Sequence, residues 1–277
     1  MNTNIIDKPR NKHAKYKFGW VRDLPDHRDH LYSVCWMPLE QKMTLPVSTN
    51  LTSKFPPVYD QGALGSCTAN AIGAVFEYDQ IKQKLTPWVP SRLFIYYNER
   101  EMEGTVGYDS GAQIRDGIQS VVTLGIPPEY HWPYDISQFT VKPPATVYQE
   151  ALWNKATSYT RINNNNIDEL KTCLAAGFPW VFGFTVYSSF MNVDATGIVP
   201  MPSFGEDIEG GHAIVGVGYD DNTGYFKIRN SWGSAWGDHG YAYMPYEYIT
   251  NPDLASDFWT IRVVSGTPAK TKLAIDI

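Results

Sequence analysis

Residues 60–73, DQGALGSCTANAIG, place one of the chain's three cysteines, Cys67, directly after a Gly-Ser pair. Apolar residues recur at helical spacing from Ala71 to Phe76 and Ser66 suits the N-cap position, so a helix is expected to begin at Ser66 or Cys67. At a helix N-terminus the macrodipole favours the thiolate and lowers the pKa of the thiol. The stretch therefore predicts a reactive cysteine, although a lone cysteine is more often a small buried apolar residue.

The composition is that of a globular protein and indicates neither nucleic acid nor a membrane as a partner. The chain has 277 residues and a net charge of −6, without a concentrated basic patch, so nucleic acid is not an expected partner. No apolar run is long enough to span a bilayer and no secretory signal is visible, so no membrane partner is expected and a cytoplasmic location is the default. The cysteines Cys35, Cys67 and Cys173 form neither a disulfide framework nor a CxxC metal site. No metal or other cofactor is expected.

The sequence pattern divides the chain into three parts. Residues 1–44 are polar and charged and are expected to form an extension without its own core. Residues 45–155 carry the helix described above and two further helical patterns, at 90–102 and 110–125. Residues 156–277 carry one helix at 166–177, a short C-terminal tail and several short strands that predict an antiparallel sheet or barrel, at 179–187, 212–220, 224–230, 240–244 and 258–264.

A second residue suited to chemistry, His212, opens the strand pattern that the turn DDNTG joins to the next strand, YFKIRN. The two strands are expected to form a hairpin that places Asn230 beside His212, within one or two residues of register. An amide there would orient one imidazole nitrogen and turn the other towards a thiolate. Each residue alone has a structural interpretation, but with Cys67 they form a Cys/His/Asn constellation.

Three stretches, DQGALGSCTANA, GGHAIVGVGYD and IRNSWGSAWGDHGY, closely resemble in order the signature blocks of papain-like, cathepsin-type cysteine proteases. The spacings agree, with 145 residues from Cys67 to His212 and 18 from His212 to Asn230. The similarity extends from about residue 45 to residue 264. It implies an α+β, papain-like two-domain fold, with a helical left domain, an antiparallel β-barrel-like right domain and the active-site cleft between them.

The resemblance also implies a role for each matching residue. Cys67 would be the nucleophile, His212 the base that then protonates the leaving amine, and Asn230 the group that orients His212. Gln61 would donate a hydrogen bond to the oxyanion together with the backbone N–H of Cys67. The other implied positions are Trp232, which shields the His-Asn bond; Trp236, on the primed side; Gly111, which pairs with extended substrate; and Ser110, where the family has a second glycine. Without the resemblance both tryptophans would be ordinary aromatic core.

Some positions depart from the family pattern. Leu64 and Tyr108 stand where disulfide cysteines are usual, which indicates a disulfide-poor prokaryotic or viral branch, and Thr68 replaces the usual tryptophan after the nucleophile. The stretch LASDFW (254–259) resembles the strand at the floor of the pocket for the second residue before the scissile bond. Asp257 would lie near the base of that pocket and favour some tolerance of Arg or Lys; the alternative is a solvated surface carboxylate.

The extension at residues 1–44 is expected to act as a short pro-segment or cleft-covering segment. It precedes the region of similarity, and GWVRDLPDHRDHLY (19–32) resembles the lead-in of prokaryotic papain-like enzymes. We expect it to pack on the enzyme as an intramolecular inhibitor that self-cleavage removes. Its acidic and histidine residues suit a metal site in principle but fit a solvated, ion-paired stretch better; they are Asp26, His27, Asp29 and His30.

The sequence thus predicts a papain-like cysteine endopeptidase that acts on peptides or proteins through a Cys-His pair and an acyl-enzyme. One alternative is a Cys-dependent acyltransferase or isopeptidase that passes the acyl group to an amine. The other is a binding module on a protease fold with a silent active site. The intact set of Gln61, Cys67, His212 and Asn230 speaks against the silent module, and nothing in the sequence separates hydrolysis from transfer.

Overall fold

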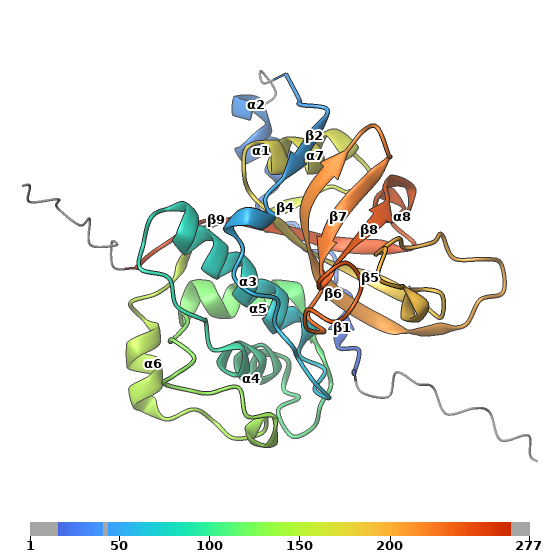
Figure 1. Cartoon of the computed structure of the whole chain (residues 1–277). Coiled ribbons are helices and arrows are strands. Elements are labelled where there is room, and N and C mark those ends of the chain that lie inside the picture. Colours follow the sequence, from blue (N-terminus) through green and yellow to red (C-terminus); the bar gives the residue numbers. More distant parts are fainter. Residues whose placement is uncertain (1–15, 41–43, 267–277) are drawn as a thin grey trace, which may run out of the picture.

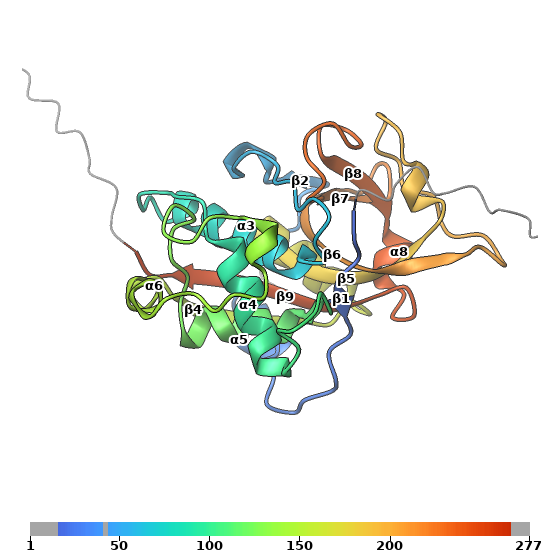
Figure 2. The same ribbon diagram turned by 90° about the horizontal axis from the view of Figure 1, so that it is seen from below.

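The chain forms a helical half and a β half that lie side by side (Figures 1 and 2), as expected for the α+β class. The computed structural model describes residues 16–40 and 44–266. The first 15 residues of the expected extension and the C-terminal tail therefore lie outside the described residues. Within the described residues, no helix is both long and apolar enough to cross a bilayer.

The helical half is built from α3 (Cys67–Lys82), α4 (Arg92–Glu103), α5 (Ile114–Thr123) and α6 (Ala145–Ala151). The β half is a seven-stranded antiparallel sheet, which contains in order β4 (Ala156–Ile162), β9 (Ala255–Val264), β5 (Trp180–Tyr187), β6 (Ile208–Asp220), β7 (Tyr225–Arg229) and β8 (Tyr241–Pro245), with β2 (Ser48–Asn50) paired to β6. Helices α7 (Ile167–Ala175) and α8 (Tyr246–Thr250) lie between strands of the sheet in the chain and pack on it. Single 3₁₀ turns lie at Thr52–Lys54, Ile136–Gln138 and Phe190–Asn192.

Helix α3 begins at Cys67, as its sequence predicts, and is buried from Cys67 to Gln80. Its alanines and Gly73 allow neighbours to approach on every side; a Cβ at Gly73 would lie 3.4 Å from Cγ of Arg92. Ser66 occupies the N-cap position but its side chain makes no capping bond. Its hydroxyl instead shares a 2.5 Å hydrogen bond with the hydroxyl of Tyr134. The start of the helix is thus fixed by tertiary contacts as much as by local preference.

Helix α5 begins at Ile114, four residues later than the pattern at 110–125 predicts. Gly111 has φ +72°, which a helix does not allow. The next two residues form β3 (Ala112–Gln113), which pairs in parallel with β1 (Trp20–Val21). A partner from the N-terminal extension, invisible to local periodicity, therefore delays the helix.

The expected hairpin is formed by β6 and β7. At its open end Val215 pairs with Arg229, so Asn230 follows the last pair and lies within two residues of the level of His212. The strand pattern at 212–220 predicts β6 correctly but misses its first four residues, Ile208–Gly211, which pair with β5. The hairpin therefore places His212 in the middle of a strand rather than at its end.

Part of the expected extension is packed into the β half. Tyr32, in α1 (Tyr32–Cys35), is fully buried in the hydrophobic core of the sheet. Its hydroxyl donates to Glu40, the last residue of α2 (Met37–Glu40), at 2.5 Å. The Glu40 carboxylate also accepts two hydrogen bonds from Arg262 of β9, at 2.6 and 3.0 Å. Residues 32–40 are thus fixed to the sheet, whereas the expected division at residues 44 and 155 stays a prediction.

We expect the Glu40→Ala variant to unfold with about 3–5 kcal/mol less free energy than the wild type, because it leaves the Arg262 charge buried without its carboxylate. The side chains of Arg262 and Glu40 are only 2% and 14% exposed. Glu101→Ala is the matched control, since the Glu101–Lys142 pair is 41% and 61% exposed and should contribute less than about 1 kcal/mol. Urea denaturation measures both. Equal losses for the two variants would contradict the anchoring role of Glu40.

Candidate active site

Cys67 lies at the first position of α3 and is fully buried. Burial raises the pKa of its thiol to about 12, while backbone hydrogen bonds from Ala213, Gly19 and Thr68 act in the opposite direction. Ala213 follows His212 in β6, so the thiol lies against the strand that carries the histidine. Desolvation therefore outweighs the expected effect of the helix N-terminus, and in this state the thiol is neutral at pH 7.

His212 is fully buried, and its Nε2 atom shares a 2.8 Å hydrogen bond with Oδ1 of Asn230. The amide oxygen only accepts, so the neutral imidazole carries its proton on Nε2 and has its lone pair on Nδ1. Nδ1 makes no hydrogen bond to any residue that the structure describes. Burial lowers the pKa of His212 to about 4, against the effect of the Asn230 bond. Asn230 thus selects the tautomer whose free nitrogen can accept a proton from a thiol.

Aromatic rings enclose this pair. The indole of Trp232 stacks on His212 with centroids 5.0 Å apart and planes at 26°, and Phe184 packs edge-on against the imidazole at 5.8 Å. Trp236 packs against Trp232 at 5.5 Å and against Phe190 at 5.3 Å. Trp232 therefore lies where a shield for the His-Asn bond is expected.

The buried amide of Gln61 holds a backbone carbonyl of the N-terminal extension. Its Nε2 atom donates to the carbonyl oxygens of Lys17 (3.0 Å) and Leu64 (2.9 Å). Its Oε1 atom accepts from the hydroxyl of Ser231 at 2.6 Å, which fixes the orientation of the amide. The group expected to bind an oxyanion is thus placed to donate to a peptide oxygen.

Residues 16–23, which we call the covering segment, lie over the candidate catalytic residues. Tyr16 stacks on Trp232 with centroids 4.8 Å apart and planes at 7° and donates to its carbonyl oxygen at 2.9 Å. Phe18 packs edge-on against His212 at 6.1 Å. The backbone N–H of Gly19 interacts with the thiol of Cys67. Figure 2 shows β1, which lies within this segment, at the junction of the helical and β halves.

The covering segment also meets two residues expected to bind substrate. The carbonyl of Gly19 accepts from the N–H of Ala112 at 2.7 Å, and a Cβ at Gly111 would lie 2.2 Å from that oxygen. The indole N–H of Trp20 donates to Asp257 at 3.1 Å. Ser110 differs, since its hydroxyl bonds to Thr105 and to the carbonyl of Gly111 within its own loop. Gly111 and Asp257 therefore lie against the covering segment, whereas the hydroxyl of Ser110 bonds within its own loop.

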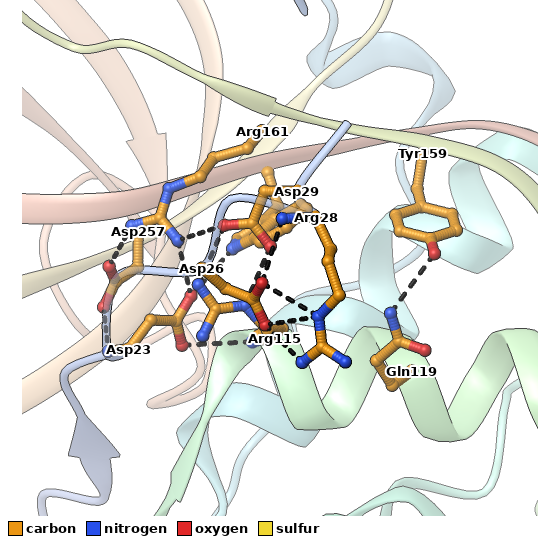
Figure 3. A network of polar contacts seen from close by, with 10 residues as sticks. Asp23, Asp26, Arg28, Asp29, Arg115, Gln119, Tyr159, Arg161 and Asp257 are labelled. Carbon is orange, nitrogen blue, oxygen red and sulfur yellow. Dashed lines mark hydrogen bonds and ion pairs between the residues drawn. The ribbon is translucent and has the colours of Figure 1, made fainter. Parts of the chain in front are cut away.

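The acidic stretch after the covering segment is ion-paired, as expected. Asp26 pairs with Arg28 at 2.6 Å, and Asp29 pairs with Arg115 at 2.8 Å and Arg161 at 3.0 Å (Figure 3). Within residues 16–40 and 44–266, no group of three or more His, Cys, Asp or Glu side chains is placed to hold a metal ion.

Residues 45–258 match the model of the papain family of cysteine proteases. The chain belongs to this papain family. It is 45% identical to xylellain, a cysteine protease from Xylella fastidiosa, with 90% of this chain and 97% of that chain covered and a TM-score of 0.82. It is 42% identical over 274 residues to an uncharacterized peptidase C1-like protein of Acanthamoeba polyphaga mimivirus, covering 90% of this chain and 87% of that protein. A cysteine protease of Carica candamarcensis shares the fold, with a TM-score of 0.60 at 23% identity over 80% of this chain and all of that one.

These matches confirm the papain-like fold and the resemblance to a disulfide-poor prokaryotic or viral branch of the papain family. All three cysteines are free, with Cys35 exposed and Cys67 and Cys173 buried. Sequence reasoning missed Phe18, Trp20 and Arg161, which contact the expected site from outside the three signature blocks. A usable signal was the aromatic run YKFGW (16–20) in an otherwise polar extension.

Proposed function

We propose that this papain-family protein is a cysteine endopeptidase whose nucleophile is Cys67. One observation carries the proposal: the Gln61 amide, the Cys67 thiol and the His212 ring all contact the same three residues of peptide, Lys17 to Gly19. A site that places these three groups around one peptide segment suits acyl transfer from a peptide.

Catalysis then follows from the roles of these groups. His212 Nδ1 takes the thiol proton, and the thiolate attacks the carbonyl carbon of the scissile peptide bond. The oxyanion that forms accepts hydrogen bonds from Gln61 Nε2 and from the Cys67 backbone N–H. The imidazolium gives its proton to the leaving amine, which leaves a thioester. Water, deprotonated by His212, attacks the thioester, and the acid and the free thiol are released.

We also propose that the covering segment keeps the full chain inactive. From Tyr16 to Trp20 it passes from Trp232 towards Asp257, whereas a substrate bound as in the family would run from the Asp257 pocket towards Trp236. Because the covering segment runs in the reverse direction, its peptide groups follow one another in the opposite order to those of a substrate and are not set for attack by Cys67. This supports an occupant that stays intact while bound. The neutral thiol and imidazole in this buried state point the same way.

The mode of release is constrained by residues 32–40. Because Tyr32 and Glu40 are fixed in the β half, the covering segment can leave the site while its C-terminal flank stays attached. Leu24 and Pro25 are exposed, so a self-cleavage that removes the segment would fall at or near these residues. Self-cleavage here would leave the anchored helices in the mature enzyme.

Hydrolysis of an internally quenched peptide by a chain opened through Tyr16→Ala and Phe18→Ala, followed by mass spectrometry with and without an added amine, tests the proposal. We expect two peptides with free ends and no activity in Cys67→Ser. Amine-capped products in place of free acids would support an acyltransferase or isopeptidase instead. No cleavage by a chain whose Cys67 is readily alkylated would overturn the proposal in favour of a silent binding module.

A further inference from the structure

The indole of Trp20 fills a pocket between β5 and β6 that exists because two side chains are missing. A Cβ at Gly183 would lie 1.9 Å from Cε2 of Trp20, and a Cβ at Gly211 would lie 2.8 Å from Cε3. The two glycines lie on neighbouring strands, where Gly183 pairs with Ala213 and Gly211 with Thr185. We call this space the Trp20 pocket. It accommodates a two-ring side chain.

The polar group at the floor of the Trp20 pocket, Asp257, already has a cation. Its Oδ1 atom accepts from Nη2 of Arg161 at 2.7 Å, and its side chain is only 1% exposed. Its Oδ2 atom accepts from the indole N–H of Trp20 at 3.1 Å and from the backbone N–H of Asp23 at 2.8 Å. The pocket thus offers one hydrogen-bond acceptor whose charge Arg161 compensates.

The charges in direct contact around Arg161 balance once the covering segment is gone. Arg161 contacts Asp257, Asp23 and Asp29, and Arg115 holds Asp29 through two hydrogen bonds of 2.8 and 2.9 Å (Figure 3). Asp23 is the surplus carboxylate, and burial beside Asp257 raises its pKa to about 6. When Asp23 leaves with the covering segment, Arg115 and Arg161 face Asp29 and Asp257. If Asp29 leaves as well, the remaining charge is positive.

We propose that the Trp20 pocket selects a large aromatic side chain with a hydrogen-bond donor, such as tryptophan, and rejects Lys and Arg, and that Arg161 determines this selectivity. The inference rests on the proposed function, because it takes the pocket as the binding site for the second residue before the scissile bond. It reverses the expectation drawn from the sequence, where Asp257 without its partner favours Lys and Arg. A Lys or Arg side chain in this pocket would be a third cation beside Arg115 and Arg161. It would find no uncompensated carboxylate and would lose its water without gaining a partner.

Trp20 itself reports this selectivity, because its fit controls access to Cys67. Rates of Cys67 alkylation by iodoacetamide are measured by intact mass on the full chain carrying Cys35→Ser, which removes the exposed thiol, and Asp23→Asn, which removes the surplus carboxylate that would otherwise pair with a new cation. We expect Trp20→Phe, which loses the N–H donor, to be labelled about 2- to 10-fold faster than the parent. Trp20→Arg should be labelled faster still, by at least about tenfold relative to the parent. Labelling of Trp20→Arg at or below the rate of Trp20→Phe would overturn the proposal without any change at Arg161.

Two substitutions at Arg161 separate charge from packing. In the Trp20→Arg chain, Arg161→Gln should restore slow labelling, because Asp257 is then free to pair with the new guanidinium. Arg161→Lys keeps the positive charge and should leave labelling fast. Equal labelling of the two double variants would show that the charge of Arg161 does not set the selectivity. Urea denaturation of each variant confirms that the compared chains are folded.

Peptide hydrolysis extends the test to substrates. In a chain opened by Tyr16→Ala and Phe18→Ala, kcat/KM is compared for peptides that carry Trp, Leu or Arg at the second residue before the scissile bond. We expect Trp to exceed Arg by at least about tenfold, and Arg161→Gln but not Arg161→Lys to reduce that ratio by about tenfold. A ratio that Arg161→Gln leaves unchanged would overturn the proposal. Complete absence of hydrolysis would contradict the proposed function, while the labelling experiment would still decide the selectivity.

Discussion

The chain carrying Tyr16→Ala and Phe18→Ala should be alkylated at Cys67 about 100-fold faster than the parent chain without these two substitutions. Tyr16 stacks on Trp232, and Phe18 packs against His212 and Trp232. Complete burial of one such side chain contributes about 1.5–3 kcal/mol, and both are partly buried, so together they should contribute about 3 kcal/mol to the closed state. Because the labelling rate is proportional to the fraction of chains in the open state, this free energy corresponds to a change of roughly two orders of magnitude in rate. Intact-mass kinetics in the Cys35→Ser background measure it.

The control truncates two other side chains of the same stretch. Val21 and Leu24 are 42% and 73% exposed, so Val21→Ala with Leu24→Ala removes little buried apolar area and should change the labelling rate less than about threefold. If the aromatic pair and the exposed pair accelerate labelling equally, the effect is a general loosening of the chain. If neither accelerates it, the covering segment does not limit access to Cys67. Deleting residues 1–44 is a poorer test, because it also removes Tyr32 and Glu40 from the β half.

Local signals in the sequence sufficed for the elements that carry the candidate catalytic residues. The start of α3 at Cys67 and the β6–β7 hairpin depend on an N-cap, a turn and strand periodicity, all of which lie within about twenty residues. These signals place Cys67 at the start of its helix and Asn230 beside His212, whereas Gln61 follows only from the resemblance to the papain family. The first turn predicted for α5 was wrong because its start depends on a distant contact. The strand β1, which pairs with the residues just before α5, comes from a segment about ninety residues away.

The electrostatic environment could not be predicted in the same way. Arg161 lies in β4, far in sequence from Asp23 and Asp257, and no pattern in the sequence pairs these residues. The neutral state of Cys67 and His212 likewise depends on burial. The covering segment contacts both residues, and no periodicity in the sequence reveals its path. Residue types and spacing thus predict the proposed chemistry, whereas the proposed control of access and the proposed selectivity of the pocket rest on burial and long-range charge pairs.

Gln61→Ala should have opposite effects on hydrolysis and on labelling. In the chain opened by Tyr16→Ala and Phe18→Ala, it should lower kcat/KM by about 10²–10³-fold, because the oxyanion loses one of its two proposed donors. Alkylation by iodoacetamide is a displacement at a saturated carbon that forms no oxyanion, so labelling of Cys67 in that chain should persist. In a chain whose covering segment is unchanged, Gln61→Ala should make the labelling of Cys67 faster, because the carbonyl of Lys17 loses its 3.0 Å hydrogen bond to Gln61 Nε2.

Ser231→Ala provides the matched control for this substitution. It removes the 2.6 Å bond that orients the Gln61 amide but leaves Nε2 in place as a donor, so it should lower kcat/KM much less than Gln61→Ala does. If Gln61→Ala lowers labelling and hydrolysis of the opened chain to the same extent, the loss lies in the thiol or in the fold, and Gln61 is not an oxyanion donor. Because only acyl transfer places negative charge on the substrate oxygen, a loss confined to hydrolysis assigns Gln61 to that step.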